Sequence, residues 1–296
     1  RRHTRFRNVT RVQTCALPIF DYNQLAISNL MKQIGNTQNL EEGLVRHMVL
    51  NSIRAISKKF RNHGDVVIAC DGPTYWRRDV FPQYKQHRRG DREKSGHDWT
   101  AIFTILHKIR EEIAANMPYK VIRVDGAEAD DIIATLVKKY APHENIVIVS
   151  SDKDFVQLHV NKSVKQWSPI LGKFVTTTSP QRDKLEHILQ GDRGDGIPNA
   201  LSGDDSFVTG QRQKPINKKK LAEWVELSYD DLAQHSQLGH GFTRNRMLID
   251  FDNIPTNVTQ AIVAQYESIE PKPRAAMINY FMASKLTNLI SQIDEF

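Results

Sequence analysis

A short apolar run with acidic residues on both sides of it constrains the fold of this chain more than any other feature. Ile146–Val149 is uninterrupted and rich in β-branched residues, which is typical of a strand buried on both faces of a parallel sheet. A helical pattern over Ile132–Tyr140 precedes it, and Asp152 and Asp154 follow it. The order of acids, helix, strand and acids indicates a βαβ unit. We therefore predict an α/β fold with a mostly parallel sheet flanked by helices.

Two other stretches show the same arrangement of strand and acid. Val66–Cys70 is a second buried run that ends at Asp71, and Ile19–Phe20 before Asp21 could be the end of a first strand. Parallel strands place their carboxyl ends at one edge of a sheet, so we expect these acids to converge in a crevice there. Further carboxylates come from a predicted helix start and from a glycine-rich loop: Glu128, Asp130, Asp131, Asp192 and Asp195.

Carboxylates gathered in one place repel one another unless cations lie among them. Oxygen ligands favour hard divalent ions, so we expect Mg²⁺, with Mn²⁺ as a substitute. Each acid taken singly has another interpretation, because acidic residues often cap helix starts. Glu128 or Asp131 would cap one helix and Asp152 the next. The size of the whole set favours the metal site.

Aromatic and cationic residues alternate between Tyr75 and Arg89, a combination used to hold phosphates and stack bases. Gln86–His97 has almost no apolar side chain, so we expect it to become ordered on a polyanion, with a solvated loop as the alternative. A second basic stretch precedes a predicted helix over residues 221–227, where phosphate could bind, and a solvated charge run is its alternative. Its lysines are Lys214, Lys218, Lys219 and Lys220.

The first nineteen residues do not fit this pattern. They resemble translated adapter sequence more than a targeting peptide. Pro18 is also disfavoured in a central strand, because proline has no N–H to donate to a neighbouring strand. We therefore expect residues 1–19 to be a non-native leader that leaves the first strand damaged and Asp21 poorly placed. The net charge of +7 falls to +2 without the five arginines of residues 1–11, so overall basicity is weak support for nucleic-acid binding.

The remaining composition excludes several classes of protein. Cys15 and Cys70 offer no disulfide framework, which favours a reducing cytoplasm. No apolar run is long enough to span a bilayer, and we identify no targeting segment. The eleven histidines are scattered along the chain, and we predict that none is catalytic.

Taken together, the acidic motifs resemble those of the flap endonuclease and 5′ nuclease superfamily. They are the strand ends at Asp21 and Asp71, then Glu128–Asp131, Ser151–Asp154 and Gly191–Gly196, in that order. Three other segments are similar to the ribonuclease H group of T-even phages: Tyr75–Asp79, Lys165–Pro169 and Leu286–Asn288. The resemblance implies a PIN-like (resolvase-like) nuclease domain over residues 20–185 with an arch or bridge at about 76–100. It also implies a helical DNA-binding domain over residues 186–296.

The resemblance further implies roles for individual residues. Two Mg²⁺ ions would be bound or ordered by Asp21, Asp71, Glu128, Asp130, Asp131, Asp152 and Asp154, and by Asp192 and Asp195 for the second ion. Arg77 or Arg78, with Lys85, would contact the scissile phosphate, and Tyr84 would position the terminal nucleotides. Nucleic acid would also be contacted by Arg88, Arg89, Lys214, Lys218, Lys219 and Lys220.

Hydrolysis of a phosphodiester requires an activated water and neutralised phosphoryl charge, which paired metal ions and a basic side chain supply. The resemblance implies a 5′ to 3′ nuclease that acts on RNA–DNA hybrids, 5′ flaps and duplex DNA 5′ ends. It would remove lagging-strand RNA primers in phage-type replication, as a monomer in the host cytoplasm. A sliding clamp and a single-strand DNA-binding protein are candidate partners. The alternatives are a PIN-type single-strand ribonuclease and a non-catalytic nucleic-acid-binding scaffold.

Overall fold

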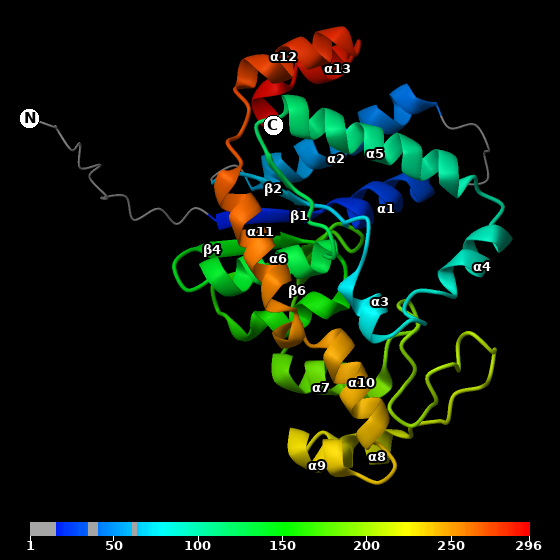
Figure 1. Cartoon of the computed structure of the whole chain (residues 1–296). Coiled ribbons are helices and arrows are strands. Elements are labelled where there is room, and N and C mark those ends of the chain that lie inside the picture. Colours follow the sequence, from blue (N-terminus) through cyan, green and yellow to red (C-terminus); the bar gives the residue numbers. More distant parts are fainter. Residues whose placement is uncertain (1–15, 35–40, 61–63) are drawn as a thin grey trace, which may run out of the picture.

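The computed structural model describes residues 16–34, 41–60 and 64–296. Its centre is a six-stranded sheet in the order β3-β2-β1-β4-β5-β6 (Figure 1). All neighbouring strands pair in parallel except β5 and β6, which form an antiparallel hairpin at one edge. The predicted fold class is therefore confirmed. The strands are β1 (Ala16–Asp21), β2 (Val67–Ala69), β3 (Lys120–Ile122), β4 (Asn145–Val149), β5 (Val164–Ser168) and β6 (Lys173–Val175).

Helices cover both faces of the sheet because successive side chains of a strand point to opposite sides. In β1, Ala16 and Phe20 share one apolar core with α1 (Tyr22–Ile34), α2 (Glu42–Lys59) and α5 (Trp99–Asn116). Leu17 and Ile19 lie in the opposite core with α6 (Ala129–Tyr140) and α11 (Thr256–Ser268). The strand β4 alternates between the same two cores, as a strand buried on both faces must.

The position of β1 corrects the expectation that residues 1–19 lie outside the fold. Residues 1–15 are outside the described part of the chain, but Ala16–Asp21 is a central strand whose six residues are all buried. The carbonyl of Ala16 accepts a hydrogen bond from Gly64 on the β2 side at 3.2 Å, and alternate residues of a strand point the same way. Pro18, two residues later, therefore also faces the β2 side, at a level before β2 begins at Val67. Its missing N–H removes no hydrogen bond to β4, so the pairing of β1 with β4 is kept.

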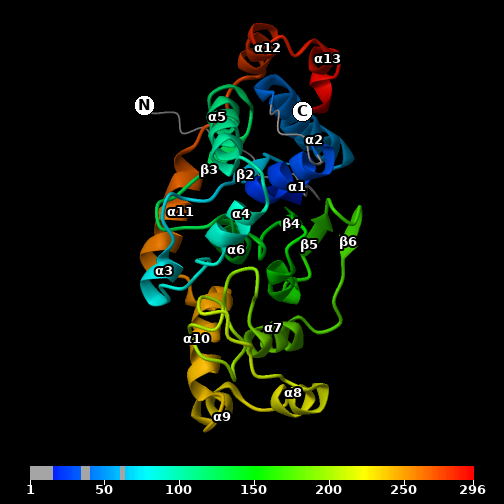
Figure 2. The ribbon, with the colours of Figure 1, turned by 90° about the vertical axis from the view of Figure 1, so that its right-hand side faces the viewer.

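A smaller lobe lies below the sheet in Figures 1 and 2, and it has its own apolar core around Leu232 and Phe242. It consists of α7 (Pro180–Gln190), α8 (Lys218–Trp224), α9 (Tyr229–Gln234) and α10 (Gly239–Ile249). The chain then returns to the sheet through η2 (Phe251–Asn253) and α11, which packs beside α6.

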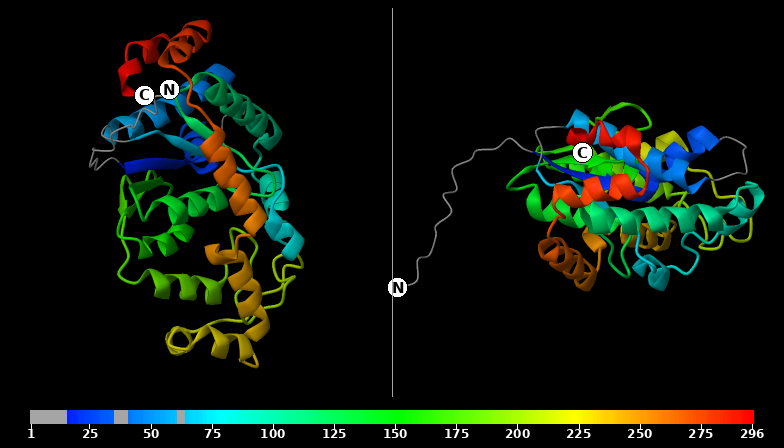
Figure 3. Two further views of the ribbon diagram at one scale, coloured as in Figure 1. Left: turned by 60° about the vertical axis from the view of Figure 1, so that its left-hand side comes forward. Right: turned by 90° about the horizontal axis from the view of Figure 1, so that it is seen from above.

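The last helices reach the opposite end of the molecule (Figure 3). There α12 (Arg274–Ala283), α13 (Thr287–Ile290) and η3 (Ile293–Glu295) pack near α5 and α2. Phe281 and Phe296 join the upper core. The expected boundary at residue 186 thus falls near the start of the lower lobe but does not divide the cores, because residues 251–296 belong with the sheet.

Two short helices lie beside the carboxyl edge of the sheet: α3 (Trp76–Val80) and α4 (Arg88–Lys94). The second occupies the segment that we expected to stay unordered without a polyanion, and none of its residues is buried. After β4, a 3-10 segment, η1 (Lys153–Val160), carries the chain away from the same edge. Among the described residues, no helix is both long and apolar enough to cross a membrane.

The central position of β1 predicts that Ile19→Ala lowers the free energy of unfolding by about 2–5 kcal/mol, because its fully buried side chain would leave a cavity. Ile170→Ala is the matched control, since Ile170 is 49% exposed, and we expect a change within about 0.5 kcal/mol. Chemical denaturation followed by circular dichroism measures both. Equally small losses would show that β1 is not part of the core.

Candidate metal centre

Four carboxylates meet in one pocket at the ends of the central strands. Asp21 is the last residue of β1, Asp71 lies two residues after β2, and Asp152 lies three residues after β4. Asp130 joins them from the first turn of α6. Together with Asp195, from the loop after α7, they line a pocket of about 740 Å³. This is the convergence that a parallel strand order predicts at its carboxyl edge.

Hydrogen bonds fix the directions of two of these carboxylates. Asp71 accepts from the side-chain amide of Asn23 at 2.6 Å and from the backbone N–H of Ala129 at 2.9 Å. Asp21 accepts from a backbone N–H of α1 and from the hydroxyl of Ser150, both at 3.1 Å. Each partner comes from a helix start or a neighbouring strand end, so backbone and side-chain donors at this edge together orient these oxygens.

Burial makes the charged forms of these acids costly. It raises the pKa of Asp21 to about 7, and the charges of Asp71 and Asp152 add to the effect. Burial, followed by the charge of Asp152, also raises the pKa of Asp130 well above its ordinary value. Divalent cations would relieve this repulsion, and carboxylate oxygens are the ligands that hard ions prefer. The residues present therefore fit a divalent metal.

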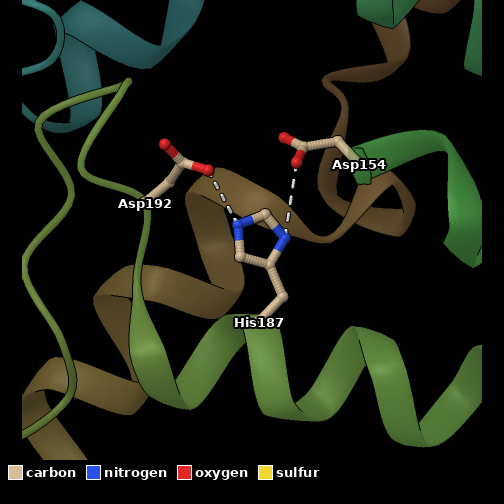
Figure 4. A group of neighbouring side chains, drawn as sticks. All are labelled: Asp154, His187 and Asp192. Carbon is tan, nitrogen blue, oxygen red and sulfur yellow. Dashed lines mark hydrogen bonds and ion pairs between the residues drawn. The ribbon is translucent and has the colours of Figure 1, made fainter. Parts of the chain in front are cut away.

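A second acidic group lies beside the first and includes a histidine (Figure 4). Nε2 of His187 lies 3.0 Å from an Asp192 carboxylate oxygen, and Nδ1 lies 3.4 Å from Asp154. The three residues offer ligand atoms that all lie within 4.8 Å of one another. Burial and the charge of Asp152 raise the pKa of Asp154. Burial would also raise that of Asp192, but hydrogen bonds from His187 and Lys153 hold its pKa below the ordinary value.

His187 was not among the predicted site residues, because its place in the site depends on a turn. It lies in the last turn of α7, five residues before Asp192. Between them Gly191 has a φ of 70°, and a Cβ at Gly191 would lie 2.4 Å from the carbonyl oxygen of Ile197. Only glycine permits this reversal. The turn brings Asp192 back to the histidine, and a glycine after a helix was the signal in the sequence.

Lys85 and Arg88 supply positive charge to the same pocket. Nζ of Lys85 lies 2.5 Å from Glu128 and 3.4 Å from Asp195, and Arg88 pairs with Asp195 at 2.7 Å. The backbone of Lys85 has a φ of 57°, a conformation that costs a non-glycine residue about 1–3 kcal/mol. Burial would lower the pKa of Lys85, but Asp195 and Glu128 raise it well above the ordinary value. The ammonium therefore stays charged.

Arg77, Glu128 and Asp131 lie beneath the pocket and do not line it. Arg77 donates to both oxygens of Asp131, at 2.8 and 2.9 Å, and to Glu128 at 2.9 Å. All three residues are buried, and Glu128 and Asp131 form the capping box that begins α6. This geometry corrects two expectations, since it supports the capping interpretation of both acids and keeps Arg77 away from any phosphate.

Tyr84 is also placed differently from expectation. Its side chain is only 1% exposed, and its hydroxyl lies 2.9 Å from Glu128 and 2.8 Å from Asp195. A buried ring cannot stack on a nucleotide. Tyr84 therefore orients the carboxylate of Asp195, and the aromatic side chains that line the pocket are the half-buried Tyr75 and Phe103.

The other predicted nucleic-acid contacts lie on the surface. Arg78 is exposed and lies 5.2 Å above the ring of Tyr75, while the side chain of Arg89 is 90% exposed. With Arg88 they line a second pocket of about 380 Å³. The four lysines are exposed on the loop before α8 and in its first turn, within the lower lobe: Lys214, Lys218, Lys219 and Lys220.

Two known protein families match this chain. Residues 22–187 match the 5′-3′ exonuclease N-terminal resolvase-like domain, and residues 178–296 match the T4 RNase H C-terminal domain. The chain belongs to the 5′-3′ exonuclease family. This exonuclease-family chain is 36% identical to Ribonuclease H of Enterobacteria phage T4, over 94% of its own length and 95% of the relative. It is 30% identical to Flap endonuclease Xni of Shewanella woodyi, over 47% of its own length and 56% of the relative.

Solved structures share the fold of this exonuclease-family chain. The T5 5′-exonuclease with bound zinc has a TM-score of 0.61 and 17% identity, over 86% of this chain and 99% of that chain. The T5 D15 flap endonuclease complex with DNA and metal ions has a TM-score of 0.59 and 17% identity, over 86% of this chain and all of the other. Membership of a nuclease family makes the chain a hydrolase, and the acidic pocket is its candidate metal site. Asp21 precedes the N-terminal family match, so its place in the pocket rests on the structure.

The repulsion in the pocket predicts that Asp130→Asn stabilises the metal-free protein by about 1–2 kcal/mol while weakening the stabilisation by added Mg²⁺. Thermal unfolding with EDTA and with Mg²⁺ measures both effects. The exposed Asp65→Asn is the control, for which neither quantity should change. An Asp130→Asn protein that is less stable without metal, yet equally stabilised by Mg²⁺, would show that Asp130 does not belong to a metal site.

The same acids predict a pH dependence of the metal-free protein. The pKa of Asp21 is raised when the protein folds, so between about pH 4 and pH 7 the folded state binds more protons than the unfolded state. Stability from this group is therefore lost as the pH rises through that window. We expect the Mg²⁺-induced rise in melting temperature to be larger at pH 8 than at pH 5, because protons compete with the ion. An equal rise at both values would contradict this account.

The neighbouring arginines Arg77 and Arg78 predict opposite phenotypes. Arg77→Met leaves the buried carboxylate of Asp131 without its ion pair and removes one of the two cations at Glu128, so it should cost about 3–5 kcal/mol of stability. Arg78→Met should change stability by no more than about 0.5 kcal/mol but weaken DNA binding, most strongly at low salt. Denaturation curves and fluorescence anisotropy on a labelled duplex measure the two quantities. Stable Arg77→Met protein with weakened DNA binding would restore Arg77 as a phosphate contact.

Proposed function

We propose that this chain is a metal-dependent 5′ to 3′ nuclease that hydrolyses phosphodiesters of RNA–DNA hybrids, 5′ flaps and duplex DNA 5′ ends. The observation that carries the proposal is the meeting of Asp21, Asp130 and Asp152 with Lys85 and Arg88 in one pocket. Acids that repel one another require cations, and the basic side chains require an anion. A nucleic-acid backbone with divalent ions satisfies both requirements.

Two Mg²⁺ ions, with Mn²⁺ as a substitute, fit the division of the acids into two groups. When bound, such ions supply an activated water and neutralise charge on the phosphoryl oxygens. Asp152 lies between the groups, since its charge raises the pKa values of Asp130 on one side and Asp154 on the other. One ion would be held by Asp21, Asp71, Asp130 and Asp152, and the other by Asp154, Asp192 and Asp195. The resemblance assigned Asp154 to the first ion, and its place beside His187 and Asp192 supports the second.

Lys85 and Arg88 would neutralise phosphoryl charge. In this structure both pair with Asp195, a proposed ligand of the second ion. Once Asp195 binds an ion, these cations lose part of their partner and can turn to the substrate. A guanidinium binds phosphate with two parallel hydrogen bonds, and Lys85, whose pKa is raised, acts through its charge and not as a base.

The exposed arginines and lysines would bind the parts of the nucleic acid that lie outside the pocket. Arg78 and Arg89 flank the pocket between α3 and α4, so they would contact the strand close to the cut. The lysines at 214 and 218–220 lie in the lower lobe and would contact the duplex away from it. The T5 relative that was crystallised with DNA supports a DNA substrate for this fold.

The relationship to the ribonuclease H of phage T4 supports a biological setting for the proposal. We propose that the chain removes RNA primers from lagging-strand fragments during phage-type replication, as a monomer in the host cytoplasm. A sliding clamp and a single-strand DNA-binding protein remain candidate partners. These assignments stay predictions.

End-labelled RNA–DNA hybrid and 5′-flap duplexes with Mg²⁺ test the proposed activity. We expect short 5′ products that disappear with EDTA and fall at least about 100-fold in the Asp154→Asn variant, because the second ion loses a ligand. Asp230→Asn, an exposed acid on α9, should cut like the original chain. Duplex binding without any cleavage would instead favour the scaffold, and cleavage of unpaired RNA alone would favour the single-strand ribonuclease.

A further inference from the structure

The pocket continues beyond Asp71 into a second, cationic part. Its lining there includes Arg110 and His107 from α5 and Arg123, which follows β3. Nε of Arg123 donates to the backbone oxygen of Asp71 at 3.2 Å, whereas the carboxylate of Asp71 is held from the other side by Asn23. Arg123 therefore contacts the backbone of a proposed metal ligand, and Arg110 and His107 line the same cavity.

The positive charge of this part is poorly balanced. Arg110 has a side chain that is only 9% exposed, and its acidic partner is Glu111, a neighbour whose own side chain is 68% exposed. Within the described residues Arg123 makes no ion pair. Burial, followed by the charges of Arg110 and Arg123, lowers the pKa of His107. Three basic groups thus share one wall with little compensation from acids.

A neutral polar group completes this wall. Gln24 lines the pocket from α1, and its side-chain oxygen is buried without a hydrogen-bond partner among the described residues. An amide oxygen and its NH₂ group can exchange places by a rotation, so Gln24 can present a donor to a ligand. Cations and an unpaired amide together form the lining that a phosphate group requires.

These cations do not serve mainly to neutralise the acids. Arg110 pairs with Glu111 at the surface, and Arg123 donates to a backbone oxygen, so among the described residues neither forms an ion pair with an acid of the pocket. Their charge is therefore available to a ligand. A phosphate monoester carries a charge of about −1.5 to −2 at pH 7, which matches two guanidinium groups better than the single charge of an internal phosphodiester.

We propose that Arg110 and Arg123 bind the 5′-terminal phosphate of the strand that the acidic site cuts, so that the protein distinguishes 5′-phosphate from 5′-hydroxyl ends. This inference rests on the proposed nuclease function and names a specificity determinant of the same pocket. The other source of the same chemistry is an internal phosphodiester of that strand. If the arginines bind a terminal phosphate, affinity depends on the 5′ end group. If they bind an internal phosphodiester, it does not.

Binding of otherwise identical RNA–DNA hybrids with either end tests the proposal. Fluorescence anisotropy would be measured with Ca²⁺ in place of Mg²⁺, after a gel has shown that the strands stay intact. We expect the 5′-phosphate hybrid to bind about tenfold more tightly, and Arg123→Gln to remove most of this preference while leaving affinity for the 5′-hydroxyl hybrid unchanged. Lys108→Gln, on the same helix but paired with Glu42, should keep the preference.

Equal affinity of the original chain for both ends would overturn the proposal. So would an Arg123→Gln variant that weakens both hybrids by the same factor, since that result assigns the cations to an internal phosphodiester. Arg110 is buried and its Gln variant could misfold, but Arg123 is only half-buried and keeps the test open. Cleavage of the 5′-hydroxyl hybrid with Mg²⁺ reports separately on the nuclease function, which fails if no hybrid is cut while the end preference persists.

Discussion

Repulsion among the carboxylates at the ends of β1, β2 and β4 is the constraint on which the rest of the structure depends. The parallel sheet places these acids together, and burial raises the pKa values of Asp21 and Asp130. Most other features of the site reduce this cost. Lys85 adopts a left-handed backbone that puts its ammonium between Glu128 and Asp195, and His187 lies between Asp154 and Asp192. The protein thus keeps an acidic pocket by surrounding it with basic groups that a metal ion could replace.

The lower lobe makes the second acidic group possible. Asp192 and Asp195 lie on a loop that cannot pack a core of its own, so α10 holds it from behind. The buried guanidinium of Arg244 donates to the carbonyl oxygens of Pro198 and Ser202, and the side chain of Asn245 donates to those of Ile188 and Pro198. These bonds fix the backbone on both sides of the acids. The helix α10 therefore contributes to the site by holding the loop rigid, whereas α7 contributes His187 directly.

The sequence predicted the parallel sheet and the convergence of Asp21, Asp71, Asp130 and Asp152, because alternation and strand order alone decide where strand ends lie. The prediction from sequence failed where the outcome depends on the direction in which a backbone group or a turn points. A hydropathy pattern does not tell which neighbouring strand the missing N–H of Pro18 faces, so the first strand was predicted to be damaged although it pairs with β4 along its length. Similarly, His187 enters the site only through the positive φ of Gly191. The sequence also did not predict which polar side chains are buried. Arg77 and Tyr84 are of the residue types that bind phosphates and bases, yet both lie buried under the pocket.

The cluster Glu128–Asp131 shows why residue type alone could not assign these roles. On a helix start, residues three apart lie on the same face, so Glu128 and Asp131 point together toward Arg77, while Asp130 is rotated toward the strand ends. The inner pair anchors the first turn of α6 through its capping box and its bonds to a buried guanidinium. This anchoring fixes the helix start that carries Asp130. Two acids of the motif therefore act as structure so that the third can face the pocket, and the spacing of the motif follows from helix geometry as much as from chemistry.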